Sequence, residues 1–178
     1  IKVWNDPGNP CCDPANKAHP AGYNDPAHVT QLAVRAKKMG FRIMVDFHYS
    51  DWWADPGKQH TPHEWEGQDI DQLRSSLYHF THHVLSTLEA NGVTPEWVQV
   101  GNEISNGMLW PTGSTDNWDN LAALIKEGYR AVKVVDSSTK VVLHYDNGGD
   151  HAGTVRWFDN ARSRGVDWDV IGLSYYPV

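Results

Sequence analysis

WVQVGNE, residues 97–103, is a short and nearly unbroken apolar run that ends abruptly on Asn102 and Glu103. Such a run between helical segments is typical of a buried strand in a parallel sheet. A carboxylate at the C-terminal end of that strand lies at the edge where α/β barrels place their chemistry. A solvated loop carboxylate, or a partner of a helix cap, would leave the same local pattern. The surrounding sequence therefore has to decide between these interpretations.

Size and composition indicate a folded, acidic chain. The 178 residues are 40% hydrophobic and 21% charged, which suits one globular domain or part of one. The formal net charge is −7 and no basic run is present. A nucleic-acid partner is not expected, because phosphate backbones are bound by clustered Lys and Arg. No apolar stretch approaches the roughly 20 residues of a membrane helix, so no membrane partner is expected either.

The two cysteines, Cys11 and Cys12, are adjacent in a Pro-rich segment. A bond between them would be strained, because neighbouring Cα atoms are only about 3.8 Å apart. Two loop thiols, or one half of a bridge to a residue outside the chain, are favoured over a metal site. A metal site needs more ligands at closer spacing.

The sequence predicts five strands separated by four helices. Asp25 is a good N-cap before Pro26, and Gly40 is a stop signal, so the first helix is expected between them. The other helices follow from apolar residues at helical spacing. They are expected at 70–91, around 121–132 and at 154–164, and the strands at 1–5, 42–48, 97–102, 140–146 and 169–175.

Alternating strands and helices predict a parallel sheet with right-handed crossovers. A doubly wound sheet would bring a G-x-G-x-x-G loop after the first strand, and WNDPGNPCCDP, residues 4–14, lacks that pattern. The (β/α)8 barrel is therefore favoured. Loops of roughly 20 residues after the first and third strands agree with it, because long loops at one face build the substrate cleft of a barrel.

Every predicted strand delivers polar side chains to the same rim. Any one of them alone, such as His48, is more readily explained as a capping or core group. Five strands doing so together indicate a functional site. The rim residues are Asn5, Asp6, Asp46, His48, Asp51, Asn102, Glu103, His144, Asp146, Asn147, Ser174, Tyr175 and Tyr176.

Five motifs carry a resemblance to a known family: VWNDP (3–7), DFHYSDWWADPGKQ (46–59), VGNEISNGMLWPTG (100–113), HYDNG (144–148) and GLSYYP (172–177). The chain resembles the arabinogalactan endo-β-1,4-galactanases of glycoside hydrolase family 53, which belong to the clan of retaining (β/α)8 glycosidases. The motifs are long, correctly ordered and spread over nearly the whole chain.

The resemblance implies that residues 1–178 are an incomplete part of a single catalytic barrel domain, covering about strands 2 to 6 of the (β/α)8 barrel. The family's nucleophilic Glu lies on the seventh strand, outside this chain. A fragment of this kind is expected to be inactive on its own unless other residues complete the barrel. Lys2 stands where the family usually has Arg, and an amine does not reproduce a bidentate guanidinium contact.

The implied reaction is endo-acting hydrolysis of β-1,4-galactosidic bonds in galactan or arabinogalactan by double displacement. Glu103 matches the family's general acid/base, which protonates the glycosidic oxygen and then activates water. Asn102 would hydrogen-bond the sugar 2-hydroxyl. The other matched residues would shape the subsites: Asp46, His48 and Tyr176 around the cleaved sugar, Asp146 and Asn147 on galactose hydroxyls, and Trp53 and Trp110 by stacking on pyranose faces.

The resemblance implies no cofactor, and the structural calcium of bacterial members belongs to late loops that are absent from this chain. The expected partner is the polysaccharide. A polymer of that size implies a secreted or periplasmic protein, and the first residues lack the features of a signal peptide, so an export signal is expected outside this chain.

Two other functions stay open from the residues alone. A non-catalytic carbohydrate-binding barrel would use the same aromatic and amide groups without a nucleophile. A metal-dependent hydrolase is suggested by His60, His63 and Glu64 in HTPHEW, but the spacing is not H-E-x-x-H and Pro62 breaks the helical face that such ligands share.

Overall fold

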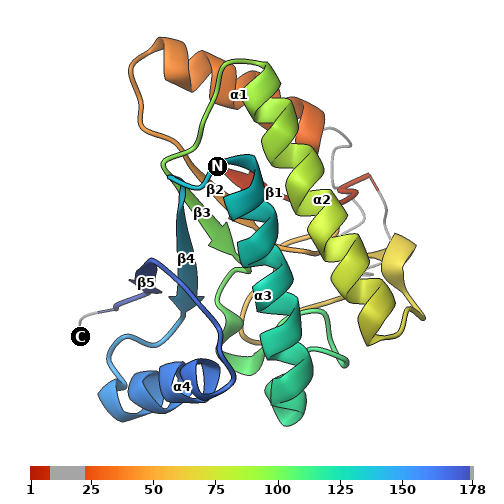
Figure 1. The fold of residues 1–178 in the computed structure, drawn as a ribbon, viewed down its shortest axis with the longest axis vertical. Helices are drawn as coiled ribbons and strands as arrows, with labels where there is room; N and C mark the ends of the chain where they lie inside the picture. The colour runs from red at the N-terminus through yellow and green to blue at the C-terminus, as the bar shows by residue number, and fades with distance from the viewer. Residues whose placement is uncertain (9–22, 177–178) are drawn as a thin grey trace.

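The computed structural model describes residues 1–8 and 23–176, and the predictions for Cys11 and Cys12 lie outside this range. Strands and helices alternate along the described chain (Figure 1). They are β1 Lys2–Val3, α1 Pro26–Lys38, β2 Met44–Phe47, α2 Ile70–Ala90, β3 Trp97–Val100, α3 Trp118–Val135, β4 Lys140–Tyr145, α4 His151–Ser163 and β5 Val170–Leu173, with single 3-10 turns at His63–Trp65, Ile104–Asn106 and Thr115–Asn117.

The sheet is parallel, and its spatial order β1-β2-β3-β4-β5 is the order of the chain. A doubly wound sheet reverses its strand order at one point, and this sheet does not. Because each right-handed crossover continues in the same direction, the helices all cover one face, with α3 between α2 and α4 (Figure 1). The α/β class and the barrel-type winding predicted from sequence are confirmed.

The strands are shorter than the sequence predicts, and non-local contacts account for the early end of β1. β1 stops at Val3, since the next two amides bond outside the ladder: Trp4 to the carbonyl of Asn24 at 2.8 Å and Asn5 to that of Ser50 at 2.9 Å. β5 ends at Leu173, which is 47% exposed, and among the described strands β4 alone pairs with β5. A sequence pattern does not reveal such partners.

Helix starts follow local capping chemistry. The Asp25 side chain accepts from the amides of Ala27 and His28, as predicted. Asp69 and Gln72 form a reciprocal capping box at α2. The fourth helix starts three residues earlier than predicted, because the Asp150 carboxylate accepts the amide of Gly153 and holds the first turn.

The core lies between the sheet and the helical layer. Val98 and Val100 of β3 are fully buried, as are Leu77 of α2 and Leu124 of α3. α3 approaches β3 very closely at Gly128, where a Cβ would lie 2.6 Å from Cγ1 of Val100. The end of β3 is therefore held firmly, and it carries the turn that leads to Glu103.

A buried hydroxyl pair joins the β2 end to α2 and supports a stability prediction. Thr81 Oγ1 donates to the carbonyl of Leu77 at 2.7 Å, so Tyr49 must donate to Thr81 Oγ1 at 2.8 Å. Burial raises the pKa of the Tyr49 phenol, which stays protonated. Thr81→Val should lower the free energy of unfolding of the intact protein by about 1–3 kcal/mol, because it leaves that hydroxyl unpaired.

Urea unfolding of Thr81→Val, Tyr49→Phe and the double variant tests this prediction. The double variant should be more stable than Thr81→Val alone, because it removes the orphaned hydroxyl. A Thr81→Val protein as stable as the parent would contradict the assignment.

Candidate active site

The chain turns sharply after β3 and presents Glu103 at the C-terminal edge of the sheet. Gly101 has φ 84°, and a Cβ there would lie 2.6 Å from Cγ2 of Ile104. Glu103 itself has φ 51°, in the left-handed region, which costs a non-glycine residue about 1–3 kcal/mol. Residues held in this region cluster at functional sites, and the turn keeps the Glu103 carboxyl only half buried.

A buried amide network joins β2 to the turn. Gln99 Nε2 donates to Asp46 Oδ1 at 2.6 Å and to Asn102 Oδ1 at 3.2 Å. Asn102 Nδ2 donates to the carbonyl of Ala54 at 2.8 Å, which fixes the orientation of its amide. One hydrogen of the Asn102 amide is used in this bond.

His48 is buried beneath this network, and its tautomer is determined by its contacts. The amide of Ala54 donates to His48 Nδ1 at 3.0 Å, so Nδ1 carries no proton. The proton is on Nε2, which lies 3.3 Å from Asp46 Oδ2 but is not aligned for a hydrogen bond. His48 is therefore a neutral imidazole that faces a carboxylate.

The Glu103 carboxyl has one side-chain partner among the described residues. Ser174 Oγ donates to Glu103 Oε1 at 3.2 Å. Ser174 Oγ also lies 2.9 Å from His144 Nε2, and the Glu103 amide donates to His144 Nδ1 at 3.3 Å. The ends of β3, β4 and β5 thus converge on this carboxyl.

Two aromatic residues come from loops above these strand ends. Trp53 is 39% exposed and packs edge-on against His48, with ring centroids 5.7 Å apart. The Lys2 ammonium lies 3.6 Å from the Trp53 ring centroid, so one ring face is occupied by a cation. Trp110 is half buried, and its amide donates to the carbonyl of Gln59 at 2.8 Å, which ties the two loops together.

Not every residue named from the sequence joins this cluster. Asp146 is half buried and makes no side-chain hydrogen bond within the described residues, although its charge acts on His144. Asn147 is exposed. Tyr176 follows β5 and is 80% exposed. Their roles on substrate stay predictions.

Two glutamines of the site were missed from the sequence. Gln99 is the one polar residue within β3 and stands in register with Asp46, which is the signal that it faces the same side. Gln59 Nε2 donates to the carbonyls of Asn102 at 2.8 Å and Glu103 at 3.4 Å, and so supports the turn. Gln59 Nε2 also donates to the nearby carbonyl of Asp55 at 3.1 Å, but its two partners in the turn are more than 40 residues away, so its support of the turn carries no local signal.

The segment considered for a metal site forms a 3-10 turn, His63–Trp65. His63 Nδ1 lies 3.3 Å from Glu66 Oε2 on the surface. Within residues 1–8 and 23–176, no three His, Cys, Asp or Glu side chains converge as metal ligands would.

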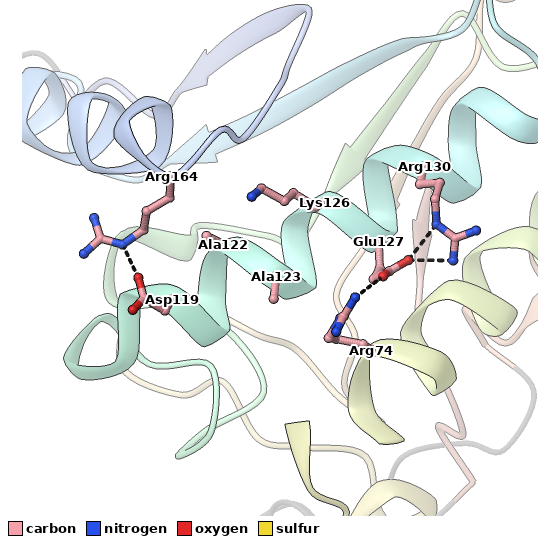
Figure 2. Close-up of a pocket in the computed structure, with 8 residues that line it drawn as sticks. All are labelled: Arg74, Asp119, Ala122, Ala123, Lys126, Glu127, Arg130 and Arg164. Carbon is pink, nitrogen blue, oxygen red and sulfur yellow. Dashed lines mark hydrogen bonds and ion pairs between the residues drawn. The ribbon is translucent and has the colours of Figure 1, made fainter. Parts of the chain in front are cut away.

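A cavity of about 520 Å³ lies on the outer helical layer, away from the strand ends (Figure 2). Apart from Lys126, its charged groups are paired with one another: Glu127 binds Arg74 at 2.8 Å and Arg130 at 2.7 Å, and Asp119 binds Arg164 at 2.7 Å. None of the site residues expected from the sequence lines it. The strand-end cluster therefore remains the candidate active site.

The charge state of His144 supports a prediction about pH. Burial lowers the pKa of His144, against the opposing effect of the Glu103, Asp46 and Asp146 carboxylates. The unfolded chain therefore takes up this proton at a higher pH than the folded protein does. The free energy of unfolding should fall as the pH drops below about 6.5, at up to about 1.4 kcal/mol per pH unit for this residue.

Denaturant unfolding of the intact protein between pH 7.5 and 5.5, compared with His144→Gln, measures this contribution. The variant should show the shallower pH dependence, because other titrating groups are common to both proteins. Equal slopes would contradict the depressed pKa of His144.

Comparisons with known proteins identify relatives of this chain. A family model described as glycosyl hydrolase family 53 matches residues 1–178. A probable arabinogalactan endo-beta-1,4-galactanase A of Aspergillus terreus is 40% identical over 172 residues, which are 93% of this chain and 48% of that protein. A solved family 53 catalytic domain of Ignisphaera aggregans superposes with a TM-score of 0.89 at 39% identity, covering 99% of this chain and 48% of that one.

A solved structure from a description of two fungal beta-1,4-galactanases also superposes on this chain. Its TM-score is 0.86 at 36% identity, and the match covers 99% of this chain and 51% of that one. The chain thus spans about half the length of the relatives it matches. The five parallel strands are part of a (β/α)8 barrel. Because the family model matches its whole length, the chain belongs to glycosyl hydrolase family 53.

Proposed function

We propose that the protein is an endo-acting glycoside hydrolase that cleaves β-1,4-galactosidic bonds in galactan or arabinogalactan with retention of configuration. The observation that carries the proposal is the placement of Glu103 next to Asn102 at the C-terminal end of β3, in a left-handed turn that other strand ends contact. The names of the relatives supply the substrate class.

In the proposed mechanism, Glu103 is the general acid/base. It gives its proton to the glycosidic oxygen as that bond breaks, and it later takes a proton from the water that releases the product. A nucleophilic carboxylate forms the covalent intermediate, and it must stand about 5–5.5 Å from Glu103. We place that nucleophile outside residues 1–178.

The residues around Glu103 would act on the sugar by contact. The Asn102 amide is suited to the 2-hydroxyl, where hydrogen bonds strengthen as positive charge develops on the ring. The open face of Trp53 is suited to the apolar face of a pyranose. Asp46 and His48 would shape the site around the cleaved sugar. Four further residues remain proposed subsite residues: Trp110, Asp146, Asn147 and Tyr176.

The proposed partner is a polysaccharide. A substrate too large to enter a cell supports a secreted or periplasmic location. Among the described helices, none combines the length and apolar character of a membrane span. We propose that the reaction itself uses no cofactor.

A direct test incubates the protein with linear β-1,4-galactan, arabinogalactan and xylan, and follows product size and anomeric configuration. Internal cleavage of galactan with initial β-anomers and little action on xylan is expected. Inverted anomers would overturn the retaining mechanism, and binding of galactan without turnover would indicate a carbohydrate-binding protein. Intact mass, measured on the same sample, identifies the polypeptide responsible: activity at 20.1 kDa would refute a nucleophile outside this chain.

A further inference from the structure

A closed loop of hydrogen bonds starts at the backbone of Glu103 and returns to its carboxylate. The Glu103 amide donates to His144 Nδ1 at 3.3 Å, His144 Nε2 lies 2.9 Å from Ser174 Oγ, and Ser174 Oγ donates to Glu103 Oε1 at 3.2 Å. The three residues come from the ends of β3, β4 and β5. The sequence placed His144 and Ser174 on the rim without a role.

Proton counting assigns one tautomer to this loop. An amide N–H can only donate, so the bond from Glu103 places the His144 proton on Nε2, and Nδ1 then faces a second acceptor, Asn102 Oδ1, at 3.2 Å. Nε2–H then donates to Ser174 Oγ, and the single hydroxyl hydrogen of Ser174 points to Glu103 Oε1. Each bond therefore runs in the same direction and ends on a carboxylate, which has no proton to give back.

The tautomer of His144 with its proton on Nδ1 fits only a protonated Glu103. With the proton on Nδ1, His144 would donate to Asn102 Oδ1, which lies 3.2 Å away and is fixed as an acceptor by Ala54 and Gln99. Nε2 would then accept the Ser174 hydrogen, and Ser174 would turn lone pairs toward Glu103. That arrangement requires a protonated Glu103, so the ionised form of Glu103 selects the Nε2–H tautomer.

Backbone bonds hold Ser174 at the end of β5. The Ser174 amide donates to the carbonyl of Tyr145 at 3.1 Å, and its carbonyl accepts from Gly148 at 2.8 Å. Both bonds join the end of β5 to the end of β4 and its loop. The contacts of Oγ with His144 Nε2 and Glu103 Oε1 then set the position of the hydroxyl, and the tautomer of His144 decides where its hydrogen points.

We propose that His144 and Ser174 are positioning residues that act through Glu103 by aiming a hydroxyl hydrogen at its carboxylate. The proposal rests on the proposed role of Glu103 as acid/base and adds the groups that orient its carboxylate. Four titratable groups act on His144: Glu103, Asp46, Asp146 and His48. Three of them are carboxylates, and the Nε2–H tautomer leaves His144 uncharged beside them.

The first test measures the tautomer in the intact protein without any substitution. The ¹⁵N shifts of labelled histidine should show a protonated Nε2 and an unprotonated Nδ1 at His144, at a pH where Glu103 is ionised. His144→Gln assigns the resonance. A protonated Nδ1 under those conditions would overturn the proposal.

The second test uses Ser174→Ala, His144→Leu and His144→Gln, each checked by circular dichroism and thermal melting. Ser174→Ala and His144→Leu should lower kcat/KM on galactan about tenfold and move the basic limb of its pH profile upward by roughly half a pH unit, because the carboxylate loses a donor. His144→Gln keeps an N–H near the place of Nε2 and should lie closer to the parent.

An aryl β-galactoside with a good leaving group distinguishes a loss of Glu103 positioning from a general distortion of the active site. Its departure needs no proton, so kcat/KM for this substrate should change less than about threefold in the same variants. Equal losses on both substrates, with an unmoved pH profile, would overturn the inference.

Glu103→Gln in the same assays distinguishes the two proposals. Galactan hydrolysis retained in Glu103→Gln would refute the proposed function of Glu103 itself. Galactan hydrolysis lost in Glu103→Gln, with unchanged pH profiles in Ser174→Ala and His144→Leu, would refute only the role of the loop.

Discussion

Glu103→Gln is expected to lower kcat for galactan hydrolysis by about 10²- to 10⁴-fold, the range typical of a lost general acid/base. Gln has nearly the same shape, so the left-handed turn and the contact from Ser174 persist, but it neither gives nor takes a proton. The loss should therefore appear in turnover and leave galactan binding close to that of the parent. Initial rates on galactan and binding by calorimetry measure both quantities.

The matched control is Glu89→Gln, an exposed residue on α2 away from the strand ends. It should leave turnover within about twofold of the parent, because surface substitutions away from such features have small effects. A Glu103→Gln protein that still hydrolyses galactan at the parental rate would exclude Glu103 as the acid/base.

Gly101→Ala is expected to destabilise the intact protein by about 2–4 kcal/mol and to reduce activity with it. The residue has φ 84°, and a Cβ would lie 2.6 Å from Cγ2 of Ile104 and 3.2 Å from Sδ of Met108. Cγ2 is attached at the branch of Ile104 and moves little without the backbone. Relief of the clash should displace the turn that carries Asn102 and Glu103.

Gly40→Ala is a matched control for this prediction, because Gly40 has the same φ of 84° but no atom lies within 4 Å of the added Cβ. It should lose only about 1 kcal/mol, the cost of the left-handed conformation. Urea unfolding of both variants, with activity measured in parallel, isolates the packing contribution. Equal losses in the two variants would show that close packing at Gly101 has no part in the effect.

Local chemistry made most of the fold predictable. Asp25 before Pro26 identified the start of α1, and the apolar run of β3 ended near Asn102 as expected. The bounds that failed depend on distant partners: β1 ends early because the Trp4 and Asn5 amides bond to Asn24 and Ser50. The start of α4 was the exception, since the capping signal from Asp150 is local.

In the candidate site, too, some residues were predictable from the sequence and others were not. Glu103 and Asn102 were identified from the strand that precedes them, because the end of a buried parallel strand is visible in a pattern of apolar residues. Gln59 and Ala54 were not, since they act on the turn across 43 and 48 residues of intervening chain. Such contacts follow from how loops fold over the sheet edge.

The sequence by itself determined the alternation of strands and helices, the edge of the sheet where polar side chains gather, and the identity of the Asn102–Glu103 pair. Only the tertiary structure decided which atoms meet there. Ser174 reaches the Glu103 carboxylate across 71 residues, and His144 meets the Glu103 amide across 41. The physical reason is range: capping and periodicity act over a few residues, whereas proton positions depend on distances of about 3 Å between segments that only folding brings together.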